Sequence, residues 1–335
     1  MSPFAQAVTG GSLGSFGIVV IGRNEGERLR RCLASCRRGA ACVYVDSNSS
    51  DGSIDLARGV GIDVVELDLS VGFTAARARN AGFERLMTLL PDAVYVAFID
   101  GDCEWVDGWL DSALGFLEAS PDVVAVCGRR RERFPEASVF NRLCDIEWDT
   151  PPGDAKSVGG DAVFRVAAFR EAGGYRADLI AGEEPELCVR LRAAGGRIRR
   201  IAGDMTWHDA AMTRFGQWWR RNVRSGHAFA QGASLHGAPP ERHFVSETRR
   251  AVLWGAVLPL CIVILAMVTP WAWSVLLIYP LQWFRVAVRS SRDGKPMPFA
   301  YAGFLVAGRL PEAQGVIKFW IGSLLGKRSA IIEYK

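Results

Sequence analysis

The chain has 335 residues, of which 49% are hydrophobic, and this composition supports a large folded core. Its net charge of +4 is the difference between 40 basic and 36 acidic residues, and this near balance argues against a nucleic-acid-binding protein. None of the eight cysteines forms a C-x-x-C pair, which argues against a zinc site, and we expect reduced thiols in the cytosol.

Residues 1–15 are small and polar and predict a flexible N-terminal tail. Apolar strands then alternate with helical patterns. The predicted strands are 16–22, 42–46, 63–68, 93–100 and 123–129, and the predicted helices between them are 25–38, 51–59, 74–90 and 107–119. Because the strands are continuously apolar and separated by helices, the pattern predicts an α/β fold with a mostly parallel central sheet flanked by helices.

Polar residues lie where several of the predicted strands end. Asn24 and Glu25 follow the first strand, Asp46 ends the second, and Asp100 and Asp102 close the apolar run "AVYVAFI" in the stretch "FIDGDCEW". In open α/β sheets, ligands bind beyond the carboxyl ends of the strands. The sequence therefore predicts a binding site at this edge of the sheet, and an Asp-Gly turn without a ligand is the simpler alternative.

The periodicity is weaker after residue 150. Asp161 lies in the glycine-rich stretch "SVGGDAVF", which predicts either a binding loop or an ordinary turn. A helix is predicted over 184–196 and a strand over 197–203. Glu183 and Glu184 lie at the start of this helix, where acidic residues also offset the helix dipole, and His208 follows the strand in "TWHD".

A long segment, 251–284, contains no charged residue, and a helix needs roughly 20 residues to cross a bilayer. Because Pro270 divides the segment, we expect two membrane spans, 251–269 and 270–285, followed by an interfacial segment; a single span over 251–269 is the alternative. Arginines flank the segment on both sides, which predicts that both ends are cytoplasmic. The predicted organisation is a tail over 1–15, a folded domain over 16–245 and a membrane-associated region over 251–335.

Six segments, taken in order, resemble the family 2 glycosyltransferases, which have a GT-A fold. They are "IVVIGRNEGERLRRCLAS", "VDSNSSDGS", "ARARNAGFE", "FIDGDCEW", "GGDAVFRVAAFREAGGY" and "GEEPELCVRLRAAGGRI". The resemblance covers about residues 16–235. The hydrophobic C-terminal region resembles that of family members which build exopolysaccharides on membrane lipids.

The resemblance implies a UDP- or GDP-linked nucleotide-diphospho-sugar donor and a divalent metal cofactor, Mg²⁺ or Mn²⁺. Asp46 matches an aspartate that contacts the nucleotide, although Ser47 replaces the second aspartate of the usual "DDGS". Arg79 matches the arginine of the "ARN" motif, and Asp100 and Asp102 match the D-x-D motif. We therefore expect the donor site to contain Asn24, Glu25, Asp46, Arg79, Asp100, Asp102 and Asp161.

Mg²⁺ and Mn²⁺ prefer oxygen ligands, and a bound cation would neutralise the charge that develops on a diphosphate leaving group. We expect Asp102 to bind the metal, Asp100 to contact ribose or a metal-bound water, and His208 to be either a further ligand or an ordinary structural residue. Glu184 matches the position of the family's catalytic aspartate and is the expected general base, with Glu183 as its rival. A single displacement with one base inverts the anomeric carbon.

A basic and aromatic stretch precedes the uncharged segment. Its "QWWRR" resembles the Q-x-x-R-W motif of processive synthases, with Arg221 in place of the tryptophan. Two interpretations remain open: the stretch binds the donor diphosphate or the acceptor, or it is a basic juxtamembrane helix attracted to anionic lipid. The residues concerned are Gln217, Trp218, Arg220, Arg221 and Arg224.

The sequence therefore predicts a membrane-anchored, metal-dependent, inverting hexosyltransferase whose catalytic domain lies on the cytoplasmic face of the membrane. It would transfer a sugar to a lipid-linked saccharide acceptor in cell-surface or exopolysaccharide synthesis, with membrane lipid and no nucleic acid among its partners. A polyprenyl-phosphate sugar synthase is the nearest alternative. The alternative from another class is a membrane-tethered nucleotide-sugar-binding or scaffold protein without turnover.

Overall fold

The computed structural model describes residues 15–68 and 70–326, so the predicted tail lies almost entirely outside the described residues. The chain divides into two compact units. The first contains the described residues up to Arg133, together with Trp148–Ala177 and Glu183–Ala210. The second contains Phe134–Glu147, Asp178–Gly182 and the described residues from Ala211 onward.

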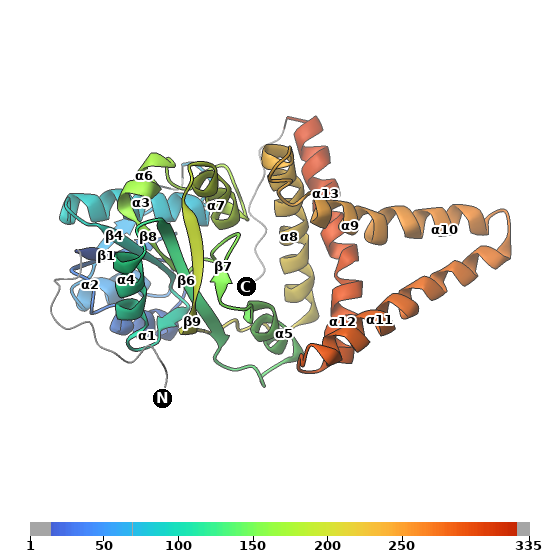
Figure 1. The fold of residues 1–335 in the computed structure, drawn as a ribbon, viewed down its shortest axis with the longest axis horizontal. Helices are drawn as coiled ribbons and strands as arrows, with labels where there is room; N and C mark the ends of the chain where they lie inside the picture. The colour runs from blue at the N-terminus through green and yellow to red at the C-terminus, as the bar shows by residue number, and fades with distance from the viewer. Residues whose placement is uncertain (1–14, 69, 327–335) are drawn as a thin grey trace. The chain divides into compact units, whose positions relative to one another are not determined.

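A nine-stranded sheet covered by helices on both faces forms the first unit (Figure 1). Its strands are β1 (Phe16–Gly22), β2 (Ala41–Asp46), β3 (Asp63–Glu66), β4 (Tyr95–Asp100), β5 (Cys103–Trp105), β6 (Val123–Glu132), β7 (Gly153–Asp154), β8 (Ala162–Arg165) and β9 (Arg197–His208). Its helices are α1 (Glu27–Ser35), α2 (Ser53–Gly59), α3 (Ala75–Leu89), α4 (Trp109–Ala119), α6 (Val166–Glu171) and α7 (Glu183–Ala193).

The order of strands across the sheet is β3-β2-β1-β4-β8-β6-β9-β5, with β7 paired to β9. The pairs β1–β2, β1–β4, β2–β3 and β6–β9 are parallel, whereas β8, β5 and β7 are antiparallel to their neighbours. Residues 18–20 of β1 are fully buried, as expected for a central strand with helices on both faces. The predicted mostly parallel sheet flanked by helices is confirmed.

The strand register brings the ends of three strands to one edge of this sheet. Within β1, Gly22 lies opposite Asp46 of β2, and Ile21 lies opposite Asp100 of β4. The two aspartates therefore flank the end of β1 at the same edge. This is the consequence of parallel pairing that the alternation of strands and helices predicts.

β5 and β9 are among the strands that differ from the prediction. β5 was not predicted, because three residues after a turn give no periodic pattern. β9 continues to His208 rather than ending at 203, and it pairs with β6 through register shifts next to Gly203, whose φ is +107°. A glycine inside a strand marks such an irregularity, and in the sequence it resembles the end of the strand.

Helices form the second unit. They are α5 (Val139–Trp148), whose last residue belongs to the first unit, α8 (Phe215–His236), α9 (Val245–Val252), the π-helical turn η1 (Leu253–Val257), α10 (Leu258–Ala266), the 3₁₀ helix η2 (Pro270–Leu277), α11 (Ile278–Arg292), α12 (Pro298–Ala307) and α13 (Arg309–Leu324). α8 and α13 lie side by side, and Gly226 of α8 directly contacts the backbone of Glu312. Figure 1 shows α10 and α11 extending away from α8 and meeting at a tip.

One helix in the described part of the chain, Val245–Ala266, is long and apolar enough to cross a membrane. It comprises α9, η1 and α10, has a mean hydropathy of 1.8 over its most apolar window, and only 11% of that window is buried. The second predicted span, 270–285, corresponds to η2 and the first part of α11. Whether the chain crosses the bilayer once or twice stays a prediction.

Candidate active site

The stretch that joins β4 to β5 is the centre of the candidate site. The backbone N–H of Asp100 donates to Asp161 Oδ1 at 3.1 Å, and the N–H of Gly101 donates to the carbonyl oxygen of Ile21 at 2.7 Å. A Cβ at position 101 would lie 3.2 Å from the same Ile21 oxygen. Glycine is needed here because the turn lies so close to the end of β1, which leaves Asp100 and Asp102 on either side of it.

A buried arginine connects Asp100 to the start of α7. The guanidinium of Arg79, on α3, is 2.8 Å from Asp100 Oδ1, 2.8 Å from Glu183 Oε1 and 3.2 Å from Glu184 Oε1. The side chains of Arg79 and Glu183 are 2% and 4% exposed, while that of Glu184 is 17% exposed. Of the two glutamates, Glu184 is therefore the more accessible to a substrate.

Burial, followed by the neighbouring charge of Glu183, raises the pKa of Glu184 to about 7, against the effect of Arg79. A carboxyl group with this pKa can accept a proton near neutral pH. Burial would also raise the pKa of Asp100, but Arg79 and Arg130 outweigh it and hold that pKa well below its usual range. Asp100 is therefore an anion whose two oxygens are both engaged by guanidinium groups.

Arg130 on β6 is a further site residue that was not predicted. Its guanidinium is 3.2 Å from Asp100 Oδ2 and 2.9 Å from Asp161 Oδ2. Asp161 is fully buried and also accepts a hydrogen bond from the hydroxyl of Thr206 at 2.7 Å. A Cβ at Gly160 would lie 2.5 Å from Asp100 Oδ2, so this glycine makes room for the ion pairs. In this structure Asp161 orients Asp100 and Arg130 through these bonds.

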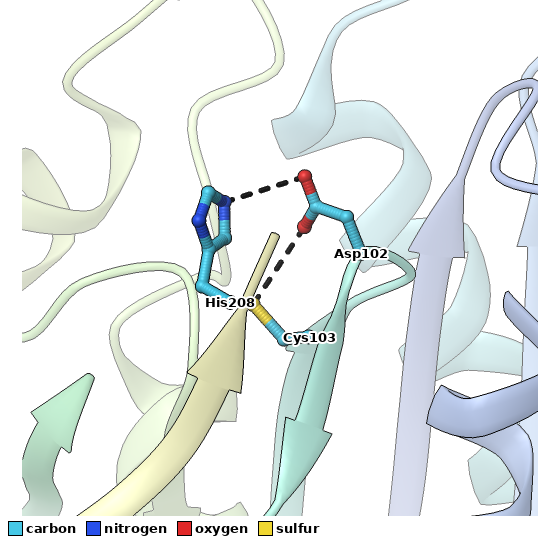
Figure 2. Close-up of side chains that lie close together, drawn as sticks. All are labelled: Asp102, Cys103 and His208. Carbon is cyan, nitrogen blue, oxygen red and sulfur yellow. Dashed lines mark hydrogen bonds and ion pairs between the residues drawn. The ribbon is translucent and has the colours of Figure 1, made fainter. Parts of the chain in front are cut away.

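Asp102 faces His208, which lies at the end of β9 (Figure 2). The distance from Asp102 Oδ2 to His208 Nε2 is 3.3 Å, and Cys103 Sγ lies 3.6 Å from Asp102 Oδ1. All three side chains are buried. Burial strongly raises the pKa of Cys103, so without a bound cation its sulfur is a thiol.

The donor set of Asp102 and His208 fits a divalent cation. A carboxylate oxygen suits Mg²⁺ and Mn²⁺, and an imidazole nitrogen is more typical of transition metals, so the combination favours Mn²⁺ over Mg²⁺. Asp100 is less available, because Arg79 and Arg130 bind both of its oxygens. The geometry therefore favours Asp102 and His208 over Asp100 as direct ligands, and the role of each stays a prediction.

Three other predicted donor-site residues lie at the end of β2 or in the loop after β1. Asp46 is buried and accepts hydrogen bonds from the hydroxyl of Tyr44 at 2.8 Å and from the N–H of Ser49 at 2.7 Å. Asn24 Oδ1 accepts from the N–H of Ser50 at 2.8 Å, and Glu25 pairs with Arg28 at 2.8 Å. These bonds fix the shape of the two loops at the edge where Asp100 ends β4.

The predicted diphosphate or acceptor residues all lie on α8, in the second unit. Gln217 Oε1 accepts from the N–H groups of Thr213 and Arg214, both at 3.0 Å, and so caps the helix. Arg221 pairs with Glu147 at 2.9 Å, and Trp218 is buried against Phe140 with ring centroids 6.4 Å apart. Arg220 is exposed and Arg224 is half-buried. The observed contacts are structural, and ligand binding by these residues stays a prediction.

Comparisons with known proteins show what the chain is similar to. Residues 17–158 match the model of the family described as "Glycosyl transferase family 2". Two curated relatives, both named pre-mycofactocin glycosyltransferase and from two strains of Mycobacterium tuberculosis, are 29% identical over 230 residues, which is 65% of this chain and 47% of theirs. The chain thus spans about half the length of these curated relatives.

A solved structure supports the fold over almost the whole chain. The mannosyltransferase PcManGT from Pyrobaculum calidifontis, solved in complex with GDP-Man and Mn²⁺, superimposes with a TM-score of 0.62 at 18% identity, covering 92% of this chain and 88% of that one. The predicted GT-A fold is confirmed by this match together with the family match. Residues 17–158 of the chain are therefore similar to glycosyl transferase family 2.

Proposed function

We propose that this protein is a membrane-associated, inverting glycosyltransferase that moves a hexose from a UDP- or GDP-linked donor to a lipid-linked saccharide acceptor. The observation that carries the proposal is the pair of acidic groups connected by Arg79. One is Glu184, whose pKa is raised to about 7. The other is Asp100, which ends β4 and lies two residues before Asp102. Sugar transfer from a diphosphate requires a base for the acceptor and positive charge for the leaving group, and Arg79 connects the proposed base to Asp100, which lies two residues before the proposed cation ligand Asp102.

The residues of the site divide the proposed reaction between them. A bound Mn²⁺ or Mg²⁺ would supply the positive charge that stabilises the departing diphosphate, with Asp102 and His208 holding it. Asp46, with Asn24 and Glu25, would bind the nucleoside. Glu184 would accept the proton of the acceptor hydroxyl as that oxygen attacks the anomeric carbon, and a single displacement inverts this centre.

The apolar helix of the second unit supports the proposed acceptor class. The helix Val245–Ala266 is apolar and largely exposed, as expected if lipid surrounds it, and arginines flank the uncharged segment. We infer attachment to the cytoplasmic membrane, a catalytic unit on its cytoplasmic face, and an acceptor carried on a lipid. The curated relatives are named for pre-mycofactocin, so an acceptor of that kind is the second acceptor class to test.

The test is metal-dependent nucleotide release by the purified full-length protein, supplied with a panel of nucleotide sugars and membrane lipid extract. We expect one donor to be preferred, and we expect release to be lost in Asp102→Ala. Asp55 is an exposed aspartate on α2, and Asp55→Ala is the matched control that should retain activity. Equal release by the two variants would refute the proposed site.

The same assay separates the alternatives. A polyprenyl-phosphate acceptor is already an anion and needs no base, so Glu184→Gln would leave a polyprenyl-phosphate sugar synthase largely active. The same variant would strongly impair transfer to a sugar hydroxyl, because a positioned base contributes roughly 10²–10⁴-fold to such reactions. Binding of a nucleotide sugar without release, with any acceptor, would instead indicate a binding or scaffold protein.

A further inference from the structure

Glu132 is a buried carboxyl group, 2% exposed, at the end of β6. Its Oε2 accepts a hydrogen bond from the N–H of Ala210 at 3.0 Å and lies 3.3 Å from His208 Nδ1. Burying a carboxyl group costs free energy unless strong hydrogen bonds compensate it. The position of Glu132 against an imidazole that also faces Asp102 therefore calls for an explanation.

The pairing of β6 with β9 places Glu132 directly opposite His208. The two ring nitrogens of His208 consequently face different carboxyl groups, Nδ1 facing Glu132 and Nε2 facing Asp102, with 3.3 Å in each case. The ring of Trp148 packs edge-on against the imidazole, with centroids 4.8 Å apart and planes at 78°, and limits its rotation. The orientation of the ring is thus fixed from two sides.

We propose that Glu132 is a positioning residue that keeps the Nδ1 proton of His208 in place and directs the Nε2 lone pair toward a divalent cation held with Asp102. With a cation bound at Nε2, the imidazole keeps its one proton on Nδ1, where the Glu132 oxygen can accept it. Nε2 and the Asp102 oxygen then face one another as two acceptors, an arrangement that a cation between them stabilises. Metal-bound histidines commonly have such a carboxylate partner on the second nitrogen.

β6 also orients Asp100, the other aspartate of the D-x-D pair. Residues two apart on a strand point to the same face, and Arg130 lies two residues before Glu132. Arg130 pairs with Asp100, while Glu132 contacts His208. One face of one strand therefore orients both the anion that is bound to arginines and the imidazole of the cation site.

The inference rests on the metal dependence in the proposed function, and Mn²⁺ binding to the full-length protein tests it without nucleotide sugar. Free Mn²⁺ is measured by electron paramagnetic resonance during titration. We expect Glu132→Ala to weaken Mn²⁺ binding about 10–100-fold, in the range observed when such carboxylate partners are removed. We expect a smaller loss in Glu132→Gln, since an amide oxygen can still accept from Nδ1.

The matched control is Glu104 on β5, which pairs with Arg133 at 2.5 Å and does not contact the imidazole in the described structure. Glu104→Ala should bind Mn²⁺ like the unsubstituted protein. If Glu132→Ala also binds Mn²⁺ like the unsubstituted protein, or if His208→Ala does, the inference is overturned. Should Glu132→Ala fail to fold, the comparison of Glu132→Gln with Glu104→Gln replaces it.

The two proposals fail differently. Unchanged Mn²⁺ binding and normal sugar transfer in Glu132→Ala refute the role of Glu132. Weakened Mn²⁺ binding in this variant, together with no sugar transfer from any donor by the unsubstituted protein, refutes the proposed function.

Discussion

Replacing Glu183 by glutamine should move the pH dependence of sugar transfer. Glu184 must lose its proton before it can act as a base, so kcat/KM should rise with pH through the pKa of Glu184. Burial raises this pKa most, and the charge of Glu183 raises it next. Glu183→Gln removes that charge and keeps an oxygen that can bond to Arg79, so the rising limb should move to lower pH.

The size of the effect is bounded by the structure. The pKa of Glu184 is raised from 4.5 to about 7. This difference of about 2.5 units corresponds to about 3 kcal/mol that disfavours the carboxylate. With a pKa of about 7, roughly a tenth of Glu184 is ionised at pH 6, and kcat/KM at pH 6 should be about a tenth of its value at pH 8. In Glu183→Gln the ratio of kcat/KM at pH 6 to kcat/KM at pH 8 should rise toward 1. The midpoint pH of the rising limb should not fall below the ordinary pKa range of a glutamate.

The assay is nucleotide release at low donor concentration between pH 5 and 9, because kcat/KM reports the ionisation of the free enzyme. Glu171, which is exposed on α6, supplies the control: Glu171→Gln should keep the pH profile of the unsubstituted protein. Glu184→Gln should lose the limb together with most of the activity. An unchanged limb in Glu183→Gln, or a normal limb in Glu184→Gln, would refute the assignment of the base.

Three further perturbations follow from contacts in the structure. Gly160→Ala should reduce kcat/KM by about 10–100-fold, measured as above, because its Cβ would lie 2.5 Å from Asp100 Oδ2 and displace that carboxylate; unchanged kinetics would contradict the packing. Gly226→Ala should lower the thermal unfolding temperature in detergent, because its Cβ would overlap the Glu312 carbonyl and overpacking costs about 1–3 kcal/mol. The control is Gly322→Ala, whose Cβ would meet no atom within 4 Å and which should not destabilise the protein. Removing divalent cations with EDTA should abolish nucleotide release, and Mn²⁺ should restore it better than Mg²⁺ because one of the proposed ligands is an imidazole; full activity in EDTA would exclude the metal site.

The edge of the sheet could be predicted because its signals are local. An apolar run that ends in a carboxylate, repeated along the chain with helices between, is sufficient to place Asp46 and Asp100 at one edge. The pairing of β1 with β2 and with β4 has this arrangement, since Asp46 and Asp100 lie opposite the last two residues of β1. The resemblance predicts Glu184 as the base with Glu183 as its rival, and the greater exposure of Glu184 and its longer distance to Arg79 support that order.

Arg130 and Glu132 could not be assigned from the sequence. They lie in "RRRER", which has the appearance of a charged surface segment. Their roles depend on β6 pairing with β9 and on which face of β6 points to the site, and neither is encoded in neighbouring residues. The charge along 129–133 is a visible signal, but it gains meaning only once the partner strand is known.

The position of β9 has a consequence for how the protein folds. It pairs with β5, β6 and β7, all of which precede it in the chain, and it contributes Thr206 and His208 to the site. While the chain is being made, β1 to β4 can pair soon after synthesis and β8 can then join β4 to β6, but β5 and β7 pair only with β9, the last strand. Such long-range pairing is slow. During refolding the ability to bind Mn²⁺ should therefore appear late, together with the closure of β9, rather than with the early formation of the parallel strands.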